Sequence, residues 1–331
     1  MASNTLVNFK KATGSVEISE PDGALTLSDR RLWNHLLAHA YPRLTKDEVF
    51  SIRLSDVRAF AAEARGGAEE ADNRRLKESI ERLQKTVVRF NFLDTAIGEV
   101  WQSAQLLGTC EIITRSGELQ YSYPRGLPEK LIEPALYSYL SLKVIYQFQS
   151  KYALILYETL KRFADRDAAE PYWPVKTSQL RDLLGCRDKL ANWQLFRRRA
   201  LDPAVAEINE FSGFVVELME IRQGSGRGGG KVVSAVFHIR RKSSEEAKTA
   251  AREIEKPRLQ RRGERKIKQA DDLTARAIRW LEGSDITTRR KWCERAQELG
   301  VQVPRAGTAK ENLHKWVPSI APLLAEEENV R

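Results

Sequence analysis

The stretch "WPVKTSQLRDL" (residues 173–183) repeats the pattern of an earlier stretch, "FSIRLSDVRAF" (residues 50–60). Both run aromatic, any, aliphatic, basic, any, Ser, polar, aliphatic, Arg, any, apolar. In each copy the first residues predict a short strand, and Ser55 and Ser178 lie near a helix start, where a hydroxyl can accept a backbone N–H. Because there are only two copies, far apart, the pattern indicates a duplicated domain and not a solenoid.

The segments around the two copies match as well. Residues 26–44 precede the first copy and residues 150–166 the second, and both have apolar residues at helical spacing. Thr26 and Asp29 resemble a capping box at the start of the first of these helices. A further helix follows each copy, over residues 73–86 and 192–211.

Alternating strands complete each half. We expect them over residues 87–93, 108–114 and 118–123 in the first half, and over 214–221 and 231–239 in the second, joined by "RQGSGRGGG". The order helix, strand, helix, helix, strand, strand is that of a winged helix. The predicted fold class is therefore α+β, with tandem pseudo-duplicated winged-helix domains and a C-terminal helical extension.

The domain boundaries follow from these patterns and from a change in composition. We expect a poorly ordered arm over 1–24, a first winged helix over 25–140 and a second over 141–242. Residues 240–268 carry 12 Lys or Arg against 5 Glu, which predicts a solvated helix or basic linker over 243–270, punctuated by Pro257 and Gly263. Short amphipathic helices predict a small helical appendage over 271–331.

The composition favours a nucleic-acid partner. The chain has 331 residues, 42% of them hydrophobic, and a formal net charge of +10, which suits folded domains with a polyanionic ligand. No signal peptide and no run of roughly 20 apolar residues is present, so we expect a cytoplasmic protein without a membrane partner. The three cysteines are widely spaced and form no CxxC pair: Cys110, Cys186 and Cys293. This argues against a zinc finger and against a disulfide scaffold.

Three patterns suggest enzyme chemistry, and each has a simpler explanation. "GSGRGGGK" (residues 224–231) lacks the first glycine and the final Ser or Thr of a P-loop, and strands flank it on both sides. His35 and His39 have zinc-protease spacing without the adjacent glutamate, which favours a packing or surface role. No histidine–apolar–histidine motif of a relaxase-type nickase is present. We therefore expect no enzyme activity, no cofactor and no metal.

The helix over 192–211 carries the strongest binding signal. Its apolar residues gather along one side of a helical wheel, and Arg198 and Arg199 point away from that side. Because an arginine can bind both O6 and N7 of guanine, these two are the first candidates for base contacts. The alternative is that "RRR" is a solvated face. Pro203 removes the hydrogen bond to the carbonyl of Arg199 and predicts a kink.

Other residues near this helix have two possible roles or complete the predicted DNA surface. Asn192 could bind adenine or cap the helix, and Arg197 could bind phosphate or form a structural ion pair. Lys189 and Gln194 are the remaining predicted contacts of this region. At the wing, Arg227 and Lys231 are expected to touch phosphate or the minor groove, the alternative being a cationic loop.

The first half is more mixed in charge. Arg74, Arg75 and Lys77 on its third helix are predicted DNA contacts, but Glu78 and Glu81 share that helix. An edge strand of its sheet is a natural place for pairing with a second copy. We interpret this half as part DNA contact and part dimer surface.

Three stretches, "YALILYETLKRFADR", "TSQLRDLLG" and "FRRRALDPAVAEINEFSGFVVE", resemble the second winged helix of the theta-type plasmid replication initiators, the iteron-binding Rep family. "LTLSDRRLWNHLLAHA" and "NRRLKESIERLQKTVVRF" resemble its first. The similarity covers roughly residues 25–241.

The resemblance implies a protein that binds directly repeated iterons at a plasmid origin as a monomer, helps to open an AT-rich region and recruits the host helicase or initiator. It also implies a homodimer that represses its own promoter. The residues alone leave a dimeric winged-helix repressor without a replication role as an alternative, distinguished by a palindromic site in place of direct repeats.

Overall fold

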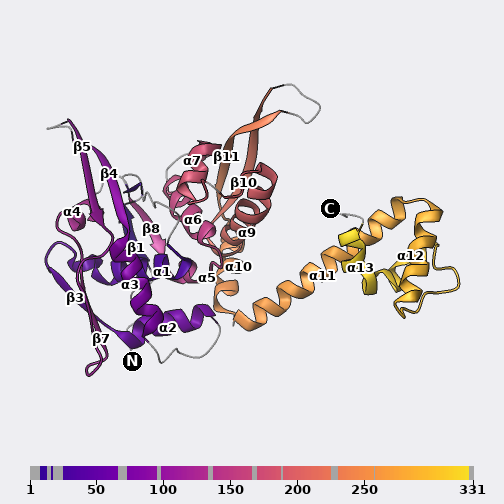
Figure 1. Cartoon of the computed structure of the whole chain (residues 1–331), viewed down its shortest axis with the longest axis horizontal. Helices are drawn as coiled ribbons and strands as arrows, with labels where there is room; N and C mark the ends of the chain where they lie inside the picture. The colour runs from indigo at the N-terminus through magenta and orange to yellow at the C-terminus, as the bar shows by residue number, and fades with distance from the viewer. Residues whose placement is uncertain are drawn as a thin grey trace. The chain divides into compact units, whose positions relative to one another are not determined.

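The computed structural model describes residues 8–12, 16–17, 25–65, 73–94, 98–132, 137–165, 170–187, 189–224, 230–256 and 258–327. It divides the chain into two compact units, Met1–Lys256 and Pro257–Arg331 (Figure 1). The first unit contains both copies of the repeated pattern. None of the helices in these described ranges has the length and apolar content needed to cross a bilayer.

The first winged helix begins with α1, and the capping box predicted at its start is present: Thr26 and Asp29 exchange hydrogen bonds between side chain and backbone. Its elements are β2 (Val16–Glu17), α1 (Leu27–Ala40), η1 (Tyr41–Arg43), β3 (Val49–Arg53), α2 (Leu54–Arg65), α3 (Arg74–Lys85), β4 (Val87–Asp94), β5 (Gly98–Gln105), β6 (Cys110–Ile113), β7 (Glu118–Ser122) and α4 (Leu127–Ile132).

The second winged helix has the same plan with fewer strands. Its helix α6 is capped by Ser150, whose hydroxyl accepts the N–H of Tyr152. The elements are β8 (Tyr137–Ser141), α5 (Leu142–Gln147), α6 (Lys151–Ala164), β9 (Tyr172–Lys176), α7 (Thr177–Leu183), α8 (Trp193–Phe196), the π-helical turn η3 (Arg197–Leu201), α9 (Asp202–Phe211), β10 (Phe214–Gln223), β11 (Lys231–Arg241) and α10 (Ser244–Glu255).

The sheets confirm that the two copies of the repeated eleven residues have the same structure. β3 pairs with β7, the second strand of the β6–β7 hairpin, and β9 pairs with β11, the second strand of the β10–β11 hairpin. The aromatic residue that opens each copy lies opposite another ring. The ring centres of Phe50 and Tyr121 are 5.5 Å apart, and those of Trp173 and Phe237 are 5.4 Å apart. Each copy is therefore strand, then helix, on one sheet.

Three sequence-based expectations need correction. The first half contains an additional strand, β5, which pairs with β4. In the sequence, this pair follows α3 and precedes the β6–β7 hairpin. The predicted arm contributes two strands: β1 (Asn8–Ala12) pairs with β8, and β2 pairs with β4. Ser55 and Ser178 do not cap their helices; the cap residue of α7 is Lys176, and the hydroxyl of Ser55 donates to Asp56.

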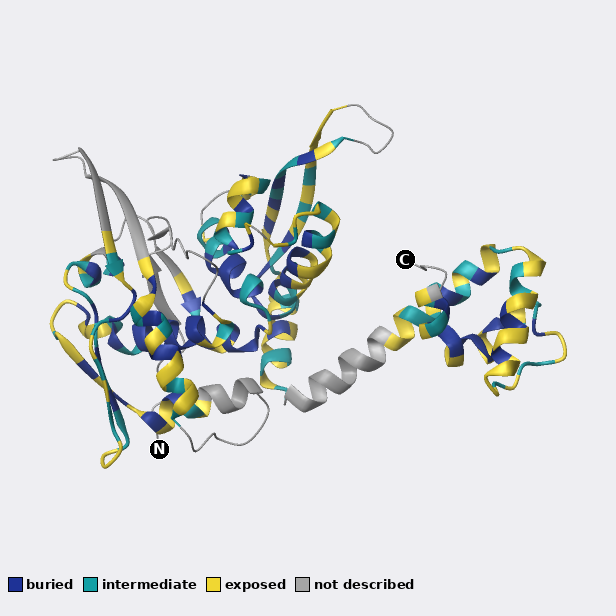
Figure 2. Ribbon diagram, in the orientation of Figure 1, coloured by how far each residue is buried: buried dark blue, intermediate teal, exposed yellow. Residues whose placement is uncertain are grey.

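A polar face of α1 joins the two halves. The guanidinium of Arg31 donates to the carbonyls of Ile145, Tyr146 and Phe148, at the end of α5 in the second half. Asn34 donates to the carboxylate of Glu158 on α6 over 2.7 Å. All of these side chains are buried, and one continuous apolar core surrounds them in both halves (Figure 2).

His35, on the same face, lies 3.1 Å from the hydroxyl of Tyr146, and His39 lies 2.8 Å from that of Tyr121. These contacts give both histidines a packing role inside the first unit. His, Cys, Asp and Glu form no group of three suited to a metal ion among the residues described above.

The second unit is helical and has its own core. It consists of α11 (Arg258–Gly283), α12 (Ile286–Glu298), η4 (Lys310–Lys315) and α13 (Val317–Glu327). Trp292 and Trp316 are fully buried in it, and the indole N–H of Trp316 donates to the carbonyl of Gly307 over 3.0 Å. α11 continues through Gly263, which was expected to interrupt it. In contrast, α10 contacts α5 and α9 and belongs to the first unit.

We predict that the first unit loses stability in mild acid because of His35. Burial, and secondarily the charge of His39, lower the pKa of His35 from 6.5 to about 4. Below pH 6.5 the unfolded chain therefore binds a proton that the folded chain excludes, and the free energy of unfolding falls by up to about 3 kcal/mol as the pH approaches 4. In urea unfolding, His35→Gln should flatten this slope; equal slopes for both proteins would contradict the assignment.

We also predict that Trp316→Ala unfolds only the second unit. Truncating a buried Trp costs about 3–5 kcal/mol, which is comparable to the whole stability of a unit this small. Hydrogen exchange of the full chain should show lost protection in α12 and α13 and unchanged protection in α1 and α6. Lys315→Ala, an exposed neighbour, is the control; a uniform loss across both units would refute the prediction.

Candidate nucleic-acid interface

The predicted reading helix consists of three joined pieces, α8, η3 and α9, which we call the reading segment (residues 193–211). Phe196, Ala200 and Leu201 are fully buried against the first unit's core. Gln194, Arg198 and Arg199 are exposed. The apolar side predicted from the sequence is thus buried, and the predicted base-contacting arginines lie on the solvent side.

The interruption predicted at Pro203 takes the form of a π-helical turn. The N–H of Asp202 donates to the carbonyl of Arg197, five residues back. Pro203 has no N–H with which to serve the carbonyl of Arg199. The helix is therefore one residue per turn wider over residues 197–201 than an α-helix. Turns of this type occur frequently at functional sites. Arg198 and Arg199 lie in this turn, on its exposed side.

Arg197 differs from the two arginines that follow it. Its guanidinium pairs with Asp202 over 2.9 Å and with Glu220 over 2.7 Å. Hydrogen bonds from these two carboxylates raise the pKa of Arg197. Of the two roles considered for Arg197, the structure shows the ion pair.

Glu220 anchors the reading segment to the wing, and the sequence analysis missed it. Its carboxylate accepts hydrogen bonds from the indole of Trp193 (2.8 Å), from Arg197 (2.7 Å) and from Arg222 (2.6 Å). Burial raises the pKa of Glu220, but these hydrogen bonds outweigh it, and the net pKa is below the usual value. Strand alternation could have identified this residue, because it shares a face of β10 with buried Phe214 and Val216.

The residues that lead into the reading segment lie at its N-terminal end. The side chain of Asn192 accepts the N–H of Leu195 over 3.1 Å, so the capping role considered for Asn192 is the one observed. Lys189, three residues earlier, is exposed. Asn192 is exposed as well.

The wing is the β10–β11 hairpin. Lys231 is exposed at the first position of β11; Arg227 lies outside the described residues. Gly230 has φ +76°, and a Cβ at this position would lie 2.5 Å from the carbonyl oxygen of Gly224 and 2.7 Å from that of Gln223. Only glycine fits here, which allows the two strands to approach closely at the end of the hairpin.

The first winged helix presents its own basic residues. Arg74, Arg75 and Lys77 are exposed on the first turn of α3. Arg74 lies 3.9 Å from Glu78 of the same helix, a weak surface pair. Farther along α3, Arg82 binds both carboxylate oxygens of Asp29 on α1 (2.8 and 2.9 Å) and so fixes α3 in place. Arg82 thus anchors the later part of α3, while the first turn is exposed.

Two family models match the chain. Residues 11–161 match the family model described as initiator replication protein, WH1, and residues 176–239 match the model described as initiator Rep protein, WH2. The chain belongs to the initiator Rep family. Both winged helices of this Rep protein fall within the first unit, and the second unit lies beyond the matched residues.

Solved structures are similar to the chain at low sequence identity, and the first of the two described here has the same fold. The crystal structure of the Pi initiator protein in complex with iteron DNA is 18% identical, with a TM-score of 0.54, and the match covers 73% of this chain and 100% of that one. A crystal structure of domains 2 and 3 of RctB is 13% identical, with a TM-score of 0.37, over 72% of this chain and 92% of that one. No curated protein sequence matches the chain.

We predict that Glu220→Gln loosens the reading segment. The substitution removes the charge that holds Arg197 and Arg222, and hydrogen bonds to charged groups contribute about 1.5–3 kcal/mol. Because the folded pKa of Glu220 is low, this contribution is present at neutral pH and is lost as the pH falls through the folded pKa. Urea unfolding at pH 7 should show the loss. Glu217→Gln, on the exposed face of β10, is the control and should change nothing; equal effects would rule out the anchor.

Proposed function

We propose that this Rep protein initiates plasmid replication by binding directly repeated iterons at the origin with both winged helices. One observation carries the proposal. The reading segment buries Phe196 and Ala200 in the core while Arg198 and Arg199 project from the opposite side, in a chain that belongs to the initiator Rep family. The fold likeness to the Pi initiator, solved on iteron DNA, supports the same ligand.

The duplication suits a long DNA site. Two winged helices on one chain can occupy consecutive major grooves about 34–36 Å apart. The exposed first turn of α3 would serve one groove and the reading segment the other. Linking the two modules makes the second contact intramolecular, which raises affinity without new contacts.

The later steps are part of the proposal. The bound initiator helps to open an adjacent AT-rich region and recruits the host helicase or initiator. As a homodimer formed through the first winged helix, it represses its own promoter. β5 and β6 lie at sheet edges in the described part of this domain, which supports pairing between copies.

The test is footprinting of the purified chain on the DNA that flanks its own gene, at physiological salt. Protection of several direct repeats of about twenty base pairs, beside an AT-rich tract, is the expected result. A single palindromic footprint would replace the initiator with a dimeric repressor. Absence of any footprint would refute DNA recognition at this locus.

We predict that Arg198→Ala and Arg199→Ala each weaken binding to the protected repeat by about 1–3 kcal/mol, because each removes a base contact. Binding to random duplex of the same length should change much less. Arg187→Ala, an exposed arginine that pairs with Asp182 outside the reading segment, is the control. An equal loss on repeat and random DNA would show that the residue binds phosphate.

A further inference from the structure

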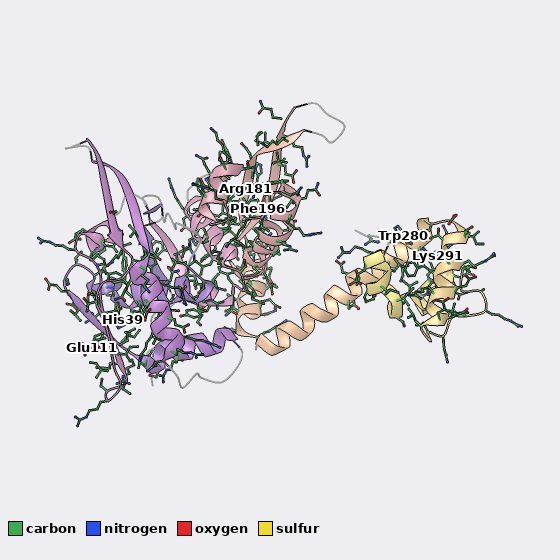
Figure 3. The ribbon with its side chains drawn as sticks, viewed as in Figure 1. His39, Glu111, Arg181, Phe196, Trp280 and Lys291 are labelled. Carbon is green, nitrogen blue, oxygen red and sulfur yellow. The ribbon has the colours of Figure 1, made fainter. Side chains whose placement is uncertain are left out.

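The arginine at the ninth position of the repeated eleven residues has no role in the interface described so far. In the second copy this residue is Arg181, on α7, which precedes the reading segment. Figure 3 shows Arg181 beside Phe196, in the second winged helix. The corresponding residue of the first copy is Arg58, on α2.

Arg181 binds the loop that leads into the reading segment. Its Nη1 donates to the carbonyl of Leu190 over 2.5 Å and to that of Lys189 over 3.3 Å, and its Nη2 donates to the carbonyl of Ala191 over 3.0 Å. The guanidinium carbon also lies 4.5 Å from the centre of the Phe196 ring, a favourable cation–π distance. Arg181 therefore holds the loop and the first turn of the reading segment together.

The loop needs such a partner. Leu190 has φ +57°, the one positive value among the described residues other than glycine. A non-glycine residue in this region is strained and persists only where the surroundings hold it. The next residue but one, Asn192, caps α8. The conformation of Leu190 thus sets the direction in which the reading segment begins.

The end of α7 holds Arg181 in place. Gly185 has φ +62°, and its N–H donates to the carbonyl of Asp182, while the N–H of Cys186 donates to the carbonyl of Arg181. This is the Schellman pattern of a helix terminus. The helix terminus therefore fixes the backbone of Arg181, and the side chain of Arg181 in turn fixes the loop of residues 189–191.

The first copy makes a related contact, to a side chain instead of to backbone carbonyls. Arg58 donates from Nη2 to the side-chain carbonyl of Asn73 over 2.5 Å. Asn73 is the residue immediately before α3, as Asn192 is immediately before α8. In both winged helices, the same repeated arginine connects the second helix to the start of the third.

A direct DNA contact does not suit Arg181. Both of its terminal nitrogens already donate to carbonyl oxygens, and its plane lies on an aromatic ring. It can act on DNA only through the segment that it holds.

We propose that Arg181, and Arg58 in the first copy, are positioning residues that set the orientation of the DNA-reading helices and thereby the discrimination between iteron and unrelated DNA. This inference rests on the proposed function. Because Arg181 contributes no phosphate contact, its removal should lower selectivity and leave the general attraction to DNA unchanged.

The experiment compares Arg181→Lys with Arg187→Lys in the full chain. Both substitutions keep the charge, but a lysine ammonium cannot reproduce the planar fork that serves three carbonyls and a ring. Dissociation constants are measured for the protected repeat and for random duplex of equal length, over a range of salt concentrations. Arg181→Lys should lower the ratio of repeat to random affinity about tenfold, with the affinity for random DNA and its salt slope unchanged. Arg187→Lys should leave the ratio as it is.

Two results would overturn the inference. An unchanged ratio in Arg181→Lys would show that the loop keeps its conformation without the arginine. An equal loss on both DNAs with a smaller salt slope would show a phosphate contact. Arg58→Lys, tested in the same way, gives an independent variant should Arg181→Lys fail to fold.

A second measurement does not depend on the ligand. Hydrogen exchange in the free protein should show faster exchange of the Trp193–Phe196 amides in Arg181→Lys than in Arg187→Lys. Equal protection would refute the positioning role. If the unchanged protein fails to bind the repeats while this difference in exchange is present, the proposed function fails and the positioning of the reading segment stands.

Discussion

The junction between the two winged helices depends on Arg31. This buried guanidinium donates to three carbonyls at the end of α5, where the last turn of a helix leaves carbonyls without intrahelical partners. Asn34 and Glu158 add a buried hydrogen bond between α1 and α6. Unpaired buried groups of this kind would cost several kcal/mol, so the two halves are held in one arrangement. One apolar core that includes residues from both halves follows from it.

The surface proposed to bind DNA is built on that base, and its arginines fall into two kinds. Arg197 and Arg181 are engaged inside the protein, by Glu220 and by loop carbonyls respectively. Arg198 and Arg199 are left on the exposed side of the reading segment. Successive residues of a helix point in different directions, so neighbouring arginines face the protein and the solvent within one turn. A base-reading helix needs both: side chains that reach a ligand, and others that keep the helix from moving.

Local patterns predicted much of the fold. The capping box at Thr26, the apolar side of the reading segment and the repeated strand–helix pair are all present, because each depends on residues close in sequence. Strand β5 and the pairing of β1 with β8 were missed. The partner of β1 lies far along the chain, so no local pattern indicates the pairing. Gly263 did not end α11, because a single glycine in a long helix costs only about 1 kcal/mol.

By itself, the sequence determined that the chain is a duplicated winged helix, which side of its reading segment is apolar and which basic residues lie opposite. These properties follow from periodicity, which reports how each residue is placed within its own helix or strand. Only the tertiary structure decided that Asn192 caps, that Arg197 pairs with Glu220 and that Arg181 holds Leu190 in a left-handed conformation. Such assignments depend on which elements meet, and a hydrogen bond forms only where packing brings donor and acceptor within about 3 Å.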